Sequence, residues 1–523
     1  MTGFLNDYIL TILIFFPIAG ALVVSVLPRS ISRHAAVAVS VIELLLSLYL
    51  WVNWGAAPRD EAGYRFAQNS LWIPEFGINY HLGVDGISVM LILLTTFLTP
   101  VCLLAAWTDI SQHTKEFAIC FLLLVAVIIG VFSALDLILF FIFWEASLVP
   151  MYLLIGVWGG ARRIYASVKF FLYTMIGSVL MWTAMLYVYF QQPEGTRSFD
   201  LMNFGEAARR IQVQNPETAL WLFAAFALAF SIKIPLFPFH TWLPDAHTEA
   251  PTAGSVDLAA VLLKTGAYGF VRFAIPFFPD AAETFAPVMI VLSLLGIVYG
   301  ALVCTMQTDF KRVIAYSSVS HVGFVMLGIF AALSAERYGD LAMTGATLQM
   351  VNHGITSAAL FLLVGILYER RHTRELSQFG GIGQVMPRYM ILLWIATFAS
   401  VGLPGLNAFV GEYLILQGVA DAEFWYAAVA ATGVILGAIY MLRTVRRVMF
   451  GEITHEENRT LKDVNTREML VVGSVLAFAV WIGLYPKPVL DIIYPDAATV
   501  ATKQFRADLS PDRNVTGSHL ARR

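Results

Sequence analysis

Charged residues and cysteines are scarce in this 523-residue chain. Only 13% of its residues are Asp, Glu, Lys or Arg, whereas 58% are hydrophobic, which is far from the composition of a soluble globular protein. Cys102, Cys120 and Cys304 stand alone in apolar runs, so the paired spacings of disulfides, zinc sites and iron–sulfur clusters are excluded. The Gly-rich stretch 380–383 lacks the spacing of a nucleotide-binding loop. A net charge of −3 without a long basic face gives no sign of nucleic-acid binding.

Long apolar runs are abundant instead. The mean hydropathy is +0.72, and a window of about 20 apolar residues per span predicts about fourteen transmembrane helices. These helices are expected near residues 8–27, 36–54, 87–107, 117–134, 137–158, 168–190, 219–236, 254–274, 286–306, 313–333, 340–368, 389–417, 425–449 and 468–485. The first is expected to be retained, because no basic segment and cleavage site mark it as a signal peptide. The sequence therefore predicts an all-α polytopic membrane protein.

Basic residues gather in alternate loops of this arrangement. The clusters are Arg29 with Arg33, Arg162 with Arg163, Lys311 with Arg312, Arg370 with Arg371 and Arg374, and Arg443 with Arg446 and Arg447. By the positive-inside bias, these loops are expected to face the cytoplasm. The longer loops 55–86 and 191–218 mix charges of both signs and fall on the opposite side. We therefore expect both termini on the periplasmic side of a bacterial inner membrane.

Ionisable residues inside the predicted spans indicate function. They are Glu145, Lys233, Lys264 and Glu412, and an ionisable group at membrane depth is costly enough to be kept mainly where it works. Three of them stand beside helix-breaking Pro or Gly residues, and such breaks fit a hydrated interior better than a lipid-facing surface. We interpret the four as a proton relay, although static ion pairs would present the same residues.

Histidines and one aspartate extend this set. His240, His247, His321 and His353 can donate and accept hydrogen bonds near neutral pH, which suits a path between charged sites. Haem ligation is the rival use, but the four lie in different segments. Asp257 lies two helical turns before Lys264 and is expected to share its face and influence its charge.

The helix breaks fall at matching places in two blocks of five spans. The Lys233 helix is the fourth span of block 117–274, the Glu412 helix is the fourth of block 286–449, and the blocks run in opposite senses. This pattern is typical of inverted-repeat transporters with a pathway at the midplane. It predicts four parts: an N-terminal three-helix segment at 1–116, the two inverted halves, and a C-terminal part at 450–523 with a loop, a last helix and a polar tail from Asp496.

The run 237–255, together with 262–269, resembles the signature of the antiporter-like membrane subunits of respiratory complex I. Residues 316–323, 352–354 and 367–370 extend the resemblance over nearly the whole bundle. Glu412 makes the chain most similar to the M-type members, the counterparts of mitochondrial chain 4. The L-type and N-type members and the multi-subunit sodium/proton antiporters usually have a lysine there. Residues 404–409 depart slightly from the small and polar residues usual in the family.

The resemblance implies a mechanism. In such subunits Glu145 would pair with Lys233, Lys264 would pass protons along an axis with His321 and His353, and Glu412 would release them toward the periplasm. The chain would then be a non-redox, proton-translocating subunit of NADH:quinone oxidoreductase, without a cofactor of its own. NADH, FMN, iron–sulfur clusters and quinone would be bound by other subunits.

The resemblance also implies partners, and it leaves alternatives. The expected partners are other complex I membrane subunits, especially the L-type and N-type ones, and the lipid bilayer, with no nucleic acid. A subunit of a multi-subunit cation/proton antiporter would use the same fold without an electron-transfer partner. A structural scaffold would hold its charges as static pairs.

Overall fold

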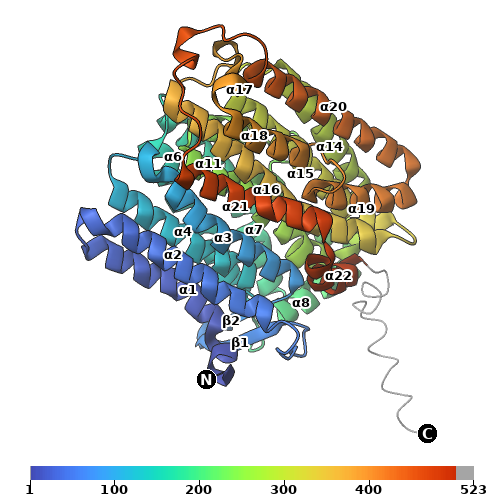
Figure 1. Ribbon diagram of the computed structural model, residues 1–523. Helices are drawn as coiled ribbons and strands as arrows, with labels where there is room; N and C mark the ends of the chain where they lie inside the picture. The colour runs from blue at the N-terminus through green and yellow to red at the C-terminus, as the bar shows by residue number, and fades with distance from the viewer. Residues whose placement is uncertain (1, 502–523) are drawn as a thin grey trace.

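The computed structural model describes residues 2–501, which form a helical bundle with one β-hairpin (Figure 1). Within this part of the chain, thirteen helical segments are long and apolar enough to cross a membrane. The remaining predicted span, 389–417, is a pair of half-helices, α18 (Pro387–Ser400) and α19 (Asn407–Ala422). The predicted polytopic membrane fold is confirmed.

The N-terminal part combines four helices with the hairpin. Its elements are α1 (Thr2–Val26), α2 (Arg29–Val52), β1 (Arg65–Ile73), η1 (Pro74–Phe76), β2 (Ile78–Val84), α3 (Gly86–Asp109) and α4 (Thr114–Ser133). The strands pair antiparallel, with Asn69 opposite His81, and Gly77 at φ +61 allows the reversal between them. The mixed-charge loop expected at 55–86 therefore contains an ordered hairpin. Asp136 fixes the hairpin to the next helix, because it accepts hydrogen bonds from Asn79 N and from Ile138 N.

Two breaks interrupt the next group of helices. The group comprises α5 (Leu137–Ala146), α6 (Leu148–Trp158), α7 (Arg163–Phe190), α8 (Leu201–Gln214), α9 (Pro216–Lys233) and α10 (Trp242–Glu249). The predicted span 137–158 is divided at Ser147, between α5 and α6. The second break lies between α9 and α10, where Pro235 and Pro238 lack the N–H groups that a continuous helix needs.

The centre of the bundle contains an irregular span followed by three long helices. The irregular span consists of α11 (Thr252–Asp257), η2 (Leu258–Leu262), α12 (Leu263–Gly269), η3 (Phe270–Ala274) and α13 (Ile275–Phe277), and it is followed by α14 (Pro279–Met306), α15 (Phe310–Ser334) and α16 (Gly339–Arg371). Both η2 and η3 are π-helical, a form found mainly as short insertions at functional sites. Helix α16 runs through the core and contacts α15, α19, α21 and α22.

The C-terminal part differs from the prediction at its end. Its elements are η4 (Leu376–Gln378), α17 (Ile382–Val385), α18, α19, α20 (Phe424–Met449), η5 (Glu456–Asn458), α21 (Thr466–Leu484) and α22 (Lys487–Ala501). Asp496 was expected to begin a polar tail, but it lies within α22. Its carboxylate pairs with Arg59 at 2.9 Å and accepts the Gly86 N–H at 2.7 Å. The tail residues 502–523 lie outside the described residues.

The bundle has two distinct ends. The hairpin, α8 and α22 lie toward one end, and α17 lies at the other (Figure 1). We call the first the hairpin side. We call the second the basic side, because the loops with the Arg and Lys clusters, such as Arg162 with Arg163, lie there.

Candidate functional site

Lys264 is the centre of a buried polar chain. It lies on α12 between the two π-helical segments and is 2% exposed. Its Nζ lies 2.7 Å from His353 Nδ1 on α16 and donates to the carbonyl oxygen of Ala259 at 2.5 Å. That carbonyl belongs to η2, so the irregular helix supplies a hydrogen-bond acceptor directly to the lysine.

His353 continues the chain toward α15 and α19. Its Nε2 lies 3.1 Å from Ser318 Oγ, and its ring centre lies 5.6 Å from that of His321. His321 Nδ1 lies 3.5 Å from Glu412 Oε1. Residues predicted from four separate segments, Lys264, His353, His321 and Glu412, are therefore brought into one file across the bundle.

The tautomer of His353 follows from its neighbours when Lys264 is charged. An ammonium group only donates, so His353 Nδ1 must then accept, and its Nε2 carries the hydrogen that faces Ser318. When Lys264 is neutral, the ring can instead donate from Nδ1. The contact therefore permits a proton to move in either direction without a large rearrangement.

The break between α18 and α19 makes room for Glu412. Gly402 in this break has φ +74, and a Cβ there would lie 2.6 Å from Glu412 Oε2. Gln349 Nε2 donates to Glu412 Oε1 at 3.2 Å, and Asn352 Nδ2 donates to the carbonyl oxygen of Asn407 at 2.8 Å, at the start of α19. Polar side chains of α16 thus bind both the Glu412 carboxylate and the backbone at the start of α19.

Glu145 and Lys233 have a looser arrangement. Lys233 is 2% exposed, and its Nζ donates to Ser147 Oγ at 3.3 Å and lies 5.0 Å from the centre of the Trp144 ring. The Oε1 atom of Glu145 has no hydrogen-bond partner among the described residues. The two charges still interact electrostatically. The pair expected from the resemblance is therefore present as neighbours, with Ser147 and Trp144 as the direct contacts of the lysine.

His240 and Asp257 lie apart from this file. The ring of His240 packs against Phe237 and Tyr299, with ring centres 5.7 and 5.3 Å away. Asp257 is 3% exposed, and its charge interacts with Cys102 on α3. Asp257 and Lys264 were expected on one helical face, but the π-helical η2 lies between them. Its wider turn changes the angle between the two side chains.

One buried residue, Lys311, was missed by the sequence analysis, and it lies near His247, which was predicted as part of the polar path. Lys311 was counted with a basic loop, yet it is 5% exposed and its Nζ donates to the Ala250 carbonyl at 2.5 Å. His247 on α10 is fully buried, stacks on Phe361 with ring centres 4.7 Å apart, and interacts electrostatically with Lys311 and Lys264. The position of Lys311 could have been predicted from Asp309, because an Asp at the N-cap indicates that α15 begins there and includes Lys311.

A cavity of about 230 Å³ on the basic side reaches Lys311. Asp109, Glu249 and Arg374 also line it. His247 interacts electrostatically both with Lys311 at this cavity and with Lys264, which makes it the candidate link between the polar file and the basic side. Among the described residues, no group of three or more His, Cys, Asp or Glu side chains is placed to hold a metal ion.

This arrangement, a bundle with broken helices and a buried file of Lys, His and Glu, agrees with the comparisons to known proteins. The family described as NADH:quinone oxidoreductase/Mrp antiporter matches residues 134–439, and the family of the NADH-ubiquinone oxidoreductase chain 4 amino terminus matches residues 64–133. The chain therefore belongs to the family of antiporter-like membrane subunits.

Individual relatives narrow the assignment within this family. NADH-quinone oxidoreductase subunit M of Rhodobacter capsulatus is 45% identical, over 98% of this chain and 99% of the relative. NADH-ubiquinone oxidoreductase chain 4 of Marchantia polymorpha is 40% identical, over 93% and 96%. A chain of respiratory complex I from Thermus thermophilus superposes with a TM-score of 0.83 at 30% identity, covering 96% of this chain and 99% of that one. Within the family, the chain groups with the subunit M and chain 4 relatives.

Proposed function

We propose that this chain is the proton-translocating M-type subunit of an NADH:quinone oxidoreductase. The observation that carries the proposal is the file of neighbouring polar groups from Lys264 through His353 and His321 to Glu412, which lies inside the membrane-spanning bundle. Buried ionisable groups in a file of this kind are the usual components of a proton pathway. The relatives named as subunits of the same oxidoreductase support the assignment.

The orientation of the chain in the membrane follows from the distribution of its basic residues. We assign the basic side to the cytoplasm by the positive-inside bias, in a bacterial inner membrane, with the hairpin side toward the periplasm. Protons would enter through the cavity at Lys311, pass His247 and reach Lys264. The N-terminal end of α1 and the C-terminal end of α22 then both lie on the periplasmic side.

Each internal step moves one proton between neighbouring groups. A charged Lys264 donates from Nζ to His353 Nδ1 while His353 Nε2–H passes its proton toward Ser318 and His321, and Glu412 accepts the proton from His321. Glu412 releases it through the break between α18 and α19. The lysine is left neutral, and it is recharged from the cytoplasmic cavity.

Glu145 influences this file electrostatically, through Lys233. When its carboxylate approaches Lys233, the ammonium form of the lysine is stabilised, and when it withdraws, that stabilisation is lost. The electrostatic change favours transfer of the proton toward Lys264. Quinone reduction in other subunits would supply the energy that moves Glu145.

The assignment also defines what other subunits contribute. NADH, FMN, iron–sulfur clusters and quinone would be bound elsewhere in the complex, with none in this chain. The L-type and N-type subunits are the proposed neighbours in the membrane. The matching breaks after Lys233 and before Glu412 support the division into an N-terminal segment, two inverted halves at 117–274 and 286–449, and a C-terminal part.

The test is NADH-driven proton pumping in inverted membrane vesicles that carry Lys264→Met. We expect normal NADH oxidation by the redox subunits under uncoupled conditions, with pumping reduced roughly 100-fold, since a step without its proton carrier rises by several kcal/mol. Lys487→Met is the matched control, because Lys487 is exposed and its partner among the described residues is Asp491 on its own helix. Normal pumping by Lys264→Met in an assembled complex would contradict the proposal. Pumping that requires sodium would favour the antiporter alternative.

A further inference from the structure

One buried carboxyl group lies outside the polar file. Glu43 is on α2, a peripheral helix in which only 28% of the apolar stretch is buried, yet Glu43 itself is 1% exposed. Neither of its carboxyl oxygens has a hydrogen-bond partner among the described residues. An ionised carboxylate in this position would lack both donors and a counter-charge, at a cost of several kcal/mol.

The surroundings of Glu43 contain no cation at its depth. Helix α2 packs against α1, α3 and α4. The charged residues of these three helices stand near their ends: Asp7 on α1, Asp109 on α3, and Lys115 with Glu116 on α4. On α2 itself, Arg29, Arg33 and His34 are in the first two turns. The neutral titratable groups of these helices are Cys102, Cys120, Tyr8 and Tyr49, and Tyr49 donates its hydroxyl hydrogen to Asn6. The nearest positive charge on the same helix is therefore several turns away.

Glu43 belongs to a stripe along the buried face of α2 in which three of the six residues are serines. The stripe consists of Ser32, Ala36, Ser40, Glu43, Ser47 and Leu50. Ser40 Oγ donates to the Val37 carbonyl at 2.8 Å, and Ser47 Oγ donates to the Leu44 carbonyl at 2.8 Å. The hydroxyl hydrogens next to Glu43 are therefore committed to the helix backbone, and they leave the carboxyl group without donors.

The facing helix provides acceptors instead. Ser47 Oγ lies 2.7 Å from Thr96 Oγ1 on α3, one helical turn from Glu43. Pro100 lies within α3 and has no N–H, so the carbonyl of Thr96, four residues earlier, loses its helical partner. An interface that offers acceptors and no donors matches a carboxyl group that carries a proton, because only its O–H can donate.

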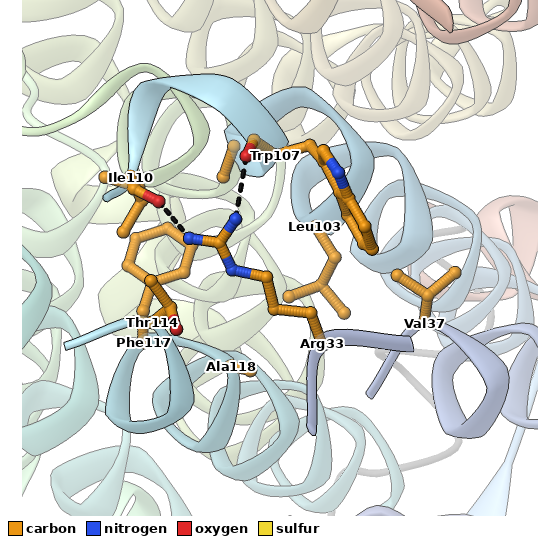
Figure 2. Close-up of a pocket in the computed structure, with 9 residues that line it drawn as sticks. Arg33, Val37, Leu103, Trp107, Ile110, Thr114, Phe117 and Ala118 are labelled. Carbon is orange, nitrogen blue, oxygen red and sulfur yellow. Dashed lines mark hydrogen bonds between the residues drawn. The ribbon is translucent and has the colours of Figure 1, made fainter. Parts of the chain in front are cut away.

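A small water-sized pocket lies at the basic end of the same stripe. In Figure 2, the guanidinium of Arg33 reaches from α2 to the carbonyls of Trp107 and Ile110 at the end of α3. The pocket has a volume of about 20 Å³, enough for one water molecule. Arg33 precedes Glu43 by ten residues, a rise of about 15 Å in a helix, with Ser40 between them. Arg33, Ser40 and Glu43 thus follow one another along α2 from the basic side inward.

We propose that Glu43 is a proton-binding site separate from the Lys264 file, protonated at rest, which exchanges its proton with the basic side along the seam between α2 and α3. The bound species is a proton, because Glu43 has no donor partner among the described residues, and Arg33, the cation on the same seam, lies ten residues away and donates to the carbonyls of Trp107 and Ile110. The site is independent of the proposed pumping mechanism, since none of its residues belongs to the polar file.

Infrared difference spectroscopy of the assembled complex tests this site directly. Subtracting the spectrum of Glu43→Gln from that of the unmodified complex at pH 7 is expected to leave the C=O band of a protonated carboxylic acid, and this band is expected to shift in D₂O. Ser40→Ala is expected to slow the shift several-fold. Glu75→Gln is the matched control, because Glu75 is an exposed glutamate near the hairpin turn. Its substitution should remove only carboxylate absorption.

Each possible infrared result either supports the proposal or overturns a stated part of it. Loss of carboxylate absorption in Glu43→Gln, with or without sensitivity to sodium, would overturn the proposal, because it would show an ionised Glu43 with a partner from outside this chain. An acid band that never shifts in D₂O would overturn exchange along the seam. If Glu43→Gln fails to assemble, Glu43→Asp provides the second measurement: it must retain an acid band at a displaced frequency. Because Lys264→Met leaves this seam intact, the Glu43 band should persist in that variant whether or not it pumps.

Discussion

The Lys264 region and the Lys233 region use the same residue types with different connectivity. Lys264 contacts the next ionisable group directly, at 2.7 Å from His353 Nδ1. Lys233 contacts a serine hydroxyl and an aromatic face, while Glu145 stands beside it without a direct ion pair. A proton can move along the first region without large side-chain motion, whereas the second requires Glu145 to approach. The Lys264 region is therefore suited to conducting protons, whereas the Lys233 region is suited to controlling when they move.

The two glutamates also differ in their access to the outside of the bundle. Glu412 is 5% exposed and surrounded by the polar side chains of α16. Glu145 is partly exposed and lies on α5, whose neighbouring Ile142 is 44% exposed. A subunit packed against this face of α5 would therefore lie closer to Glu145 than groups enclosed by the bundle allow at Glu412. This position suits a group that receives a signal from another part of a complex.

The largest predicted effect comes from interrupting the polar file at His353. We expect His353→Leu to reduce NADH-driven pumping roughly 100-fold, because Lys264 is left as an unpaired buried charge next to an interrupted file. His240→Leu is the matched control: His240 is also buried, but it packs among aromatic rings. It should change pumping less than about twofold, since its ring bridges no charged groups. Equal losses in the two variants would contradict the distinction between the file and its surroundings.

The second prediction concerns the hydroxyl that holds Lys233. Ser147→Ala removes the acceptor that lies 3.3 Å from Lys233 Nζ, and a hydrogen bond to a charged group is worth about 1.5 to 3 kcal/mol. We expect pumping in vesicles to fall about tenfold. Ser147→Thr keeps the hydroxyl and should retain most activity. If the alanine variant pumps normally, the contact with Trp144 alone holds the lysine.

The third prediction tests how tightly the helix break is packed around Glu412. Gly402→Ala places a Cβ 2.6 Å from Glu412 Oε2 at φ +74, so both contact and backbone strain, about 1 to 3 kcal/mol, oppose it. We expect a lower unfolding temperature of the purified complex and pumping reduced about fivefold. Gly473→Ala is the control, because nothing lies within 4 Å of its Cβ position. That variant should be neutral or stabilising, and a similar loss in both would show that the effect is not specific to Glu412.

Much of the bundle could be predicted because membrane spans have a strong local signature. Apolar runs of sufficient length appear directly in the sequence, and the breaks at Pro235 and Pro404 follow from missing backbone donors. The file of Lys264, His353, His321 and Glu412 was anticipated as a set, although its order in space came only from the packing of α12, α15, α16 and α19. Helix α22 was missed because its polar residues suggested a tail.

Other features depend on packing that the sequence does not reveal. Lys311 has the same local composition as a loop lysine, and only the position of the α15 N-cap places it inside the bundle. The π-helical turns beside Lys264 have no local signal among apolar residues, so Asp257 was assigned to the same face. Glu43 was overlooked because one acidic residue hardly changes the hydropathy of a span, and its burial depends on contacts with α3 and α4.

The smallest predicted effect concerns Asp136, at the start of the helix that carries Glu145. Asp136 caps α5, the helix that carries Glu145, from outside the membrane-spanning segment, and burial raises the pKa of its carboxyl group to about 6. A raised folded-state pKa means that the protonated form is favoured by folding. The stability that protonation provides is therefore complete below the unfolded-state pKa and is lost as the pH rises through about 6.

Asp136→Asn removes this titration and keeps a good N-cap. Between pH 5 and pH 7.5, we expect the unmodified protein to lose about 1 kcal/mol of stability relative to the variant, measured as the change in the difference between their unfolding temperatures. The neighbouring pair His81 and Asp200 is unchanged in both proteins, so the comparison isolates the contribution of Asp136. A difference that stays constant with pH would show that Asp136 is ionised throughout. A difference that grows as predicted would show that the start of α5 responds to pH, and the mobility required of Glu145 would then have a structural origin in its own helix.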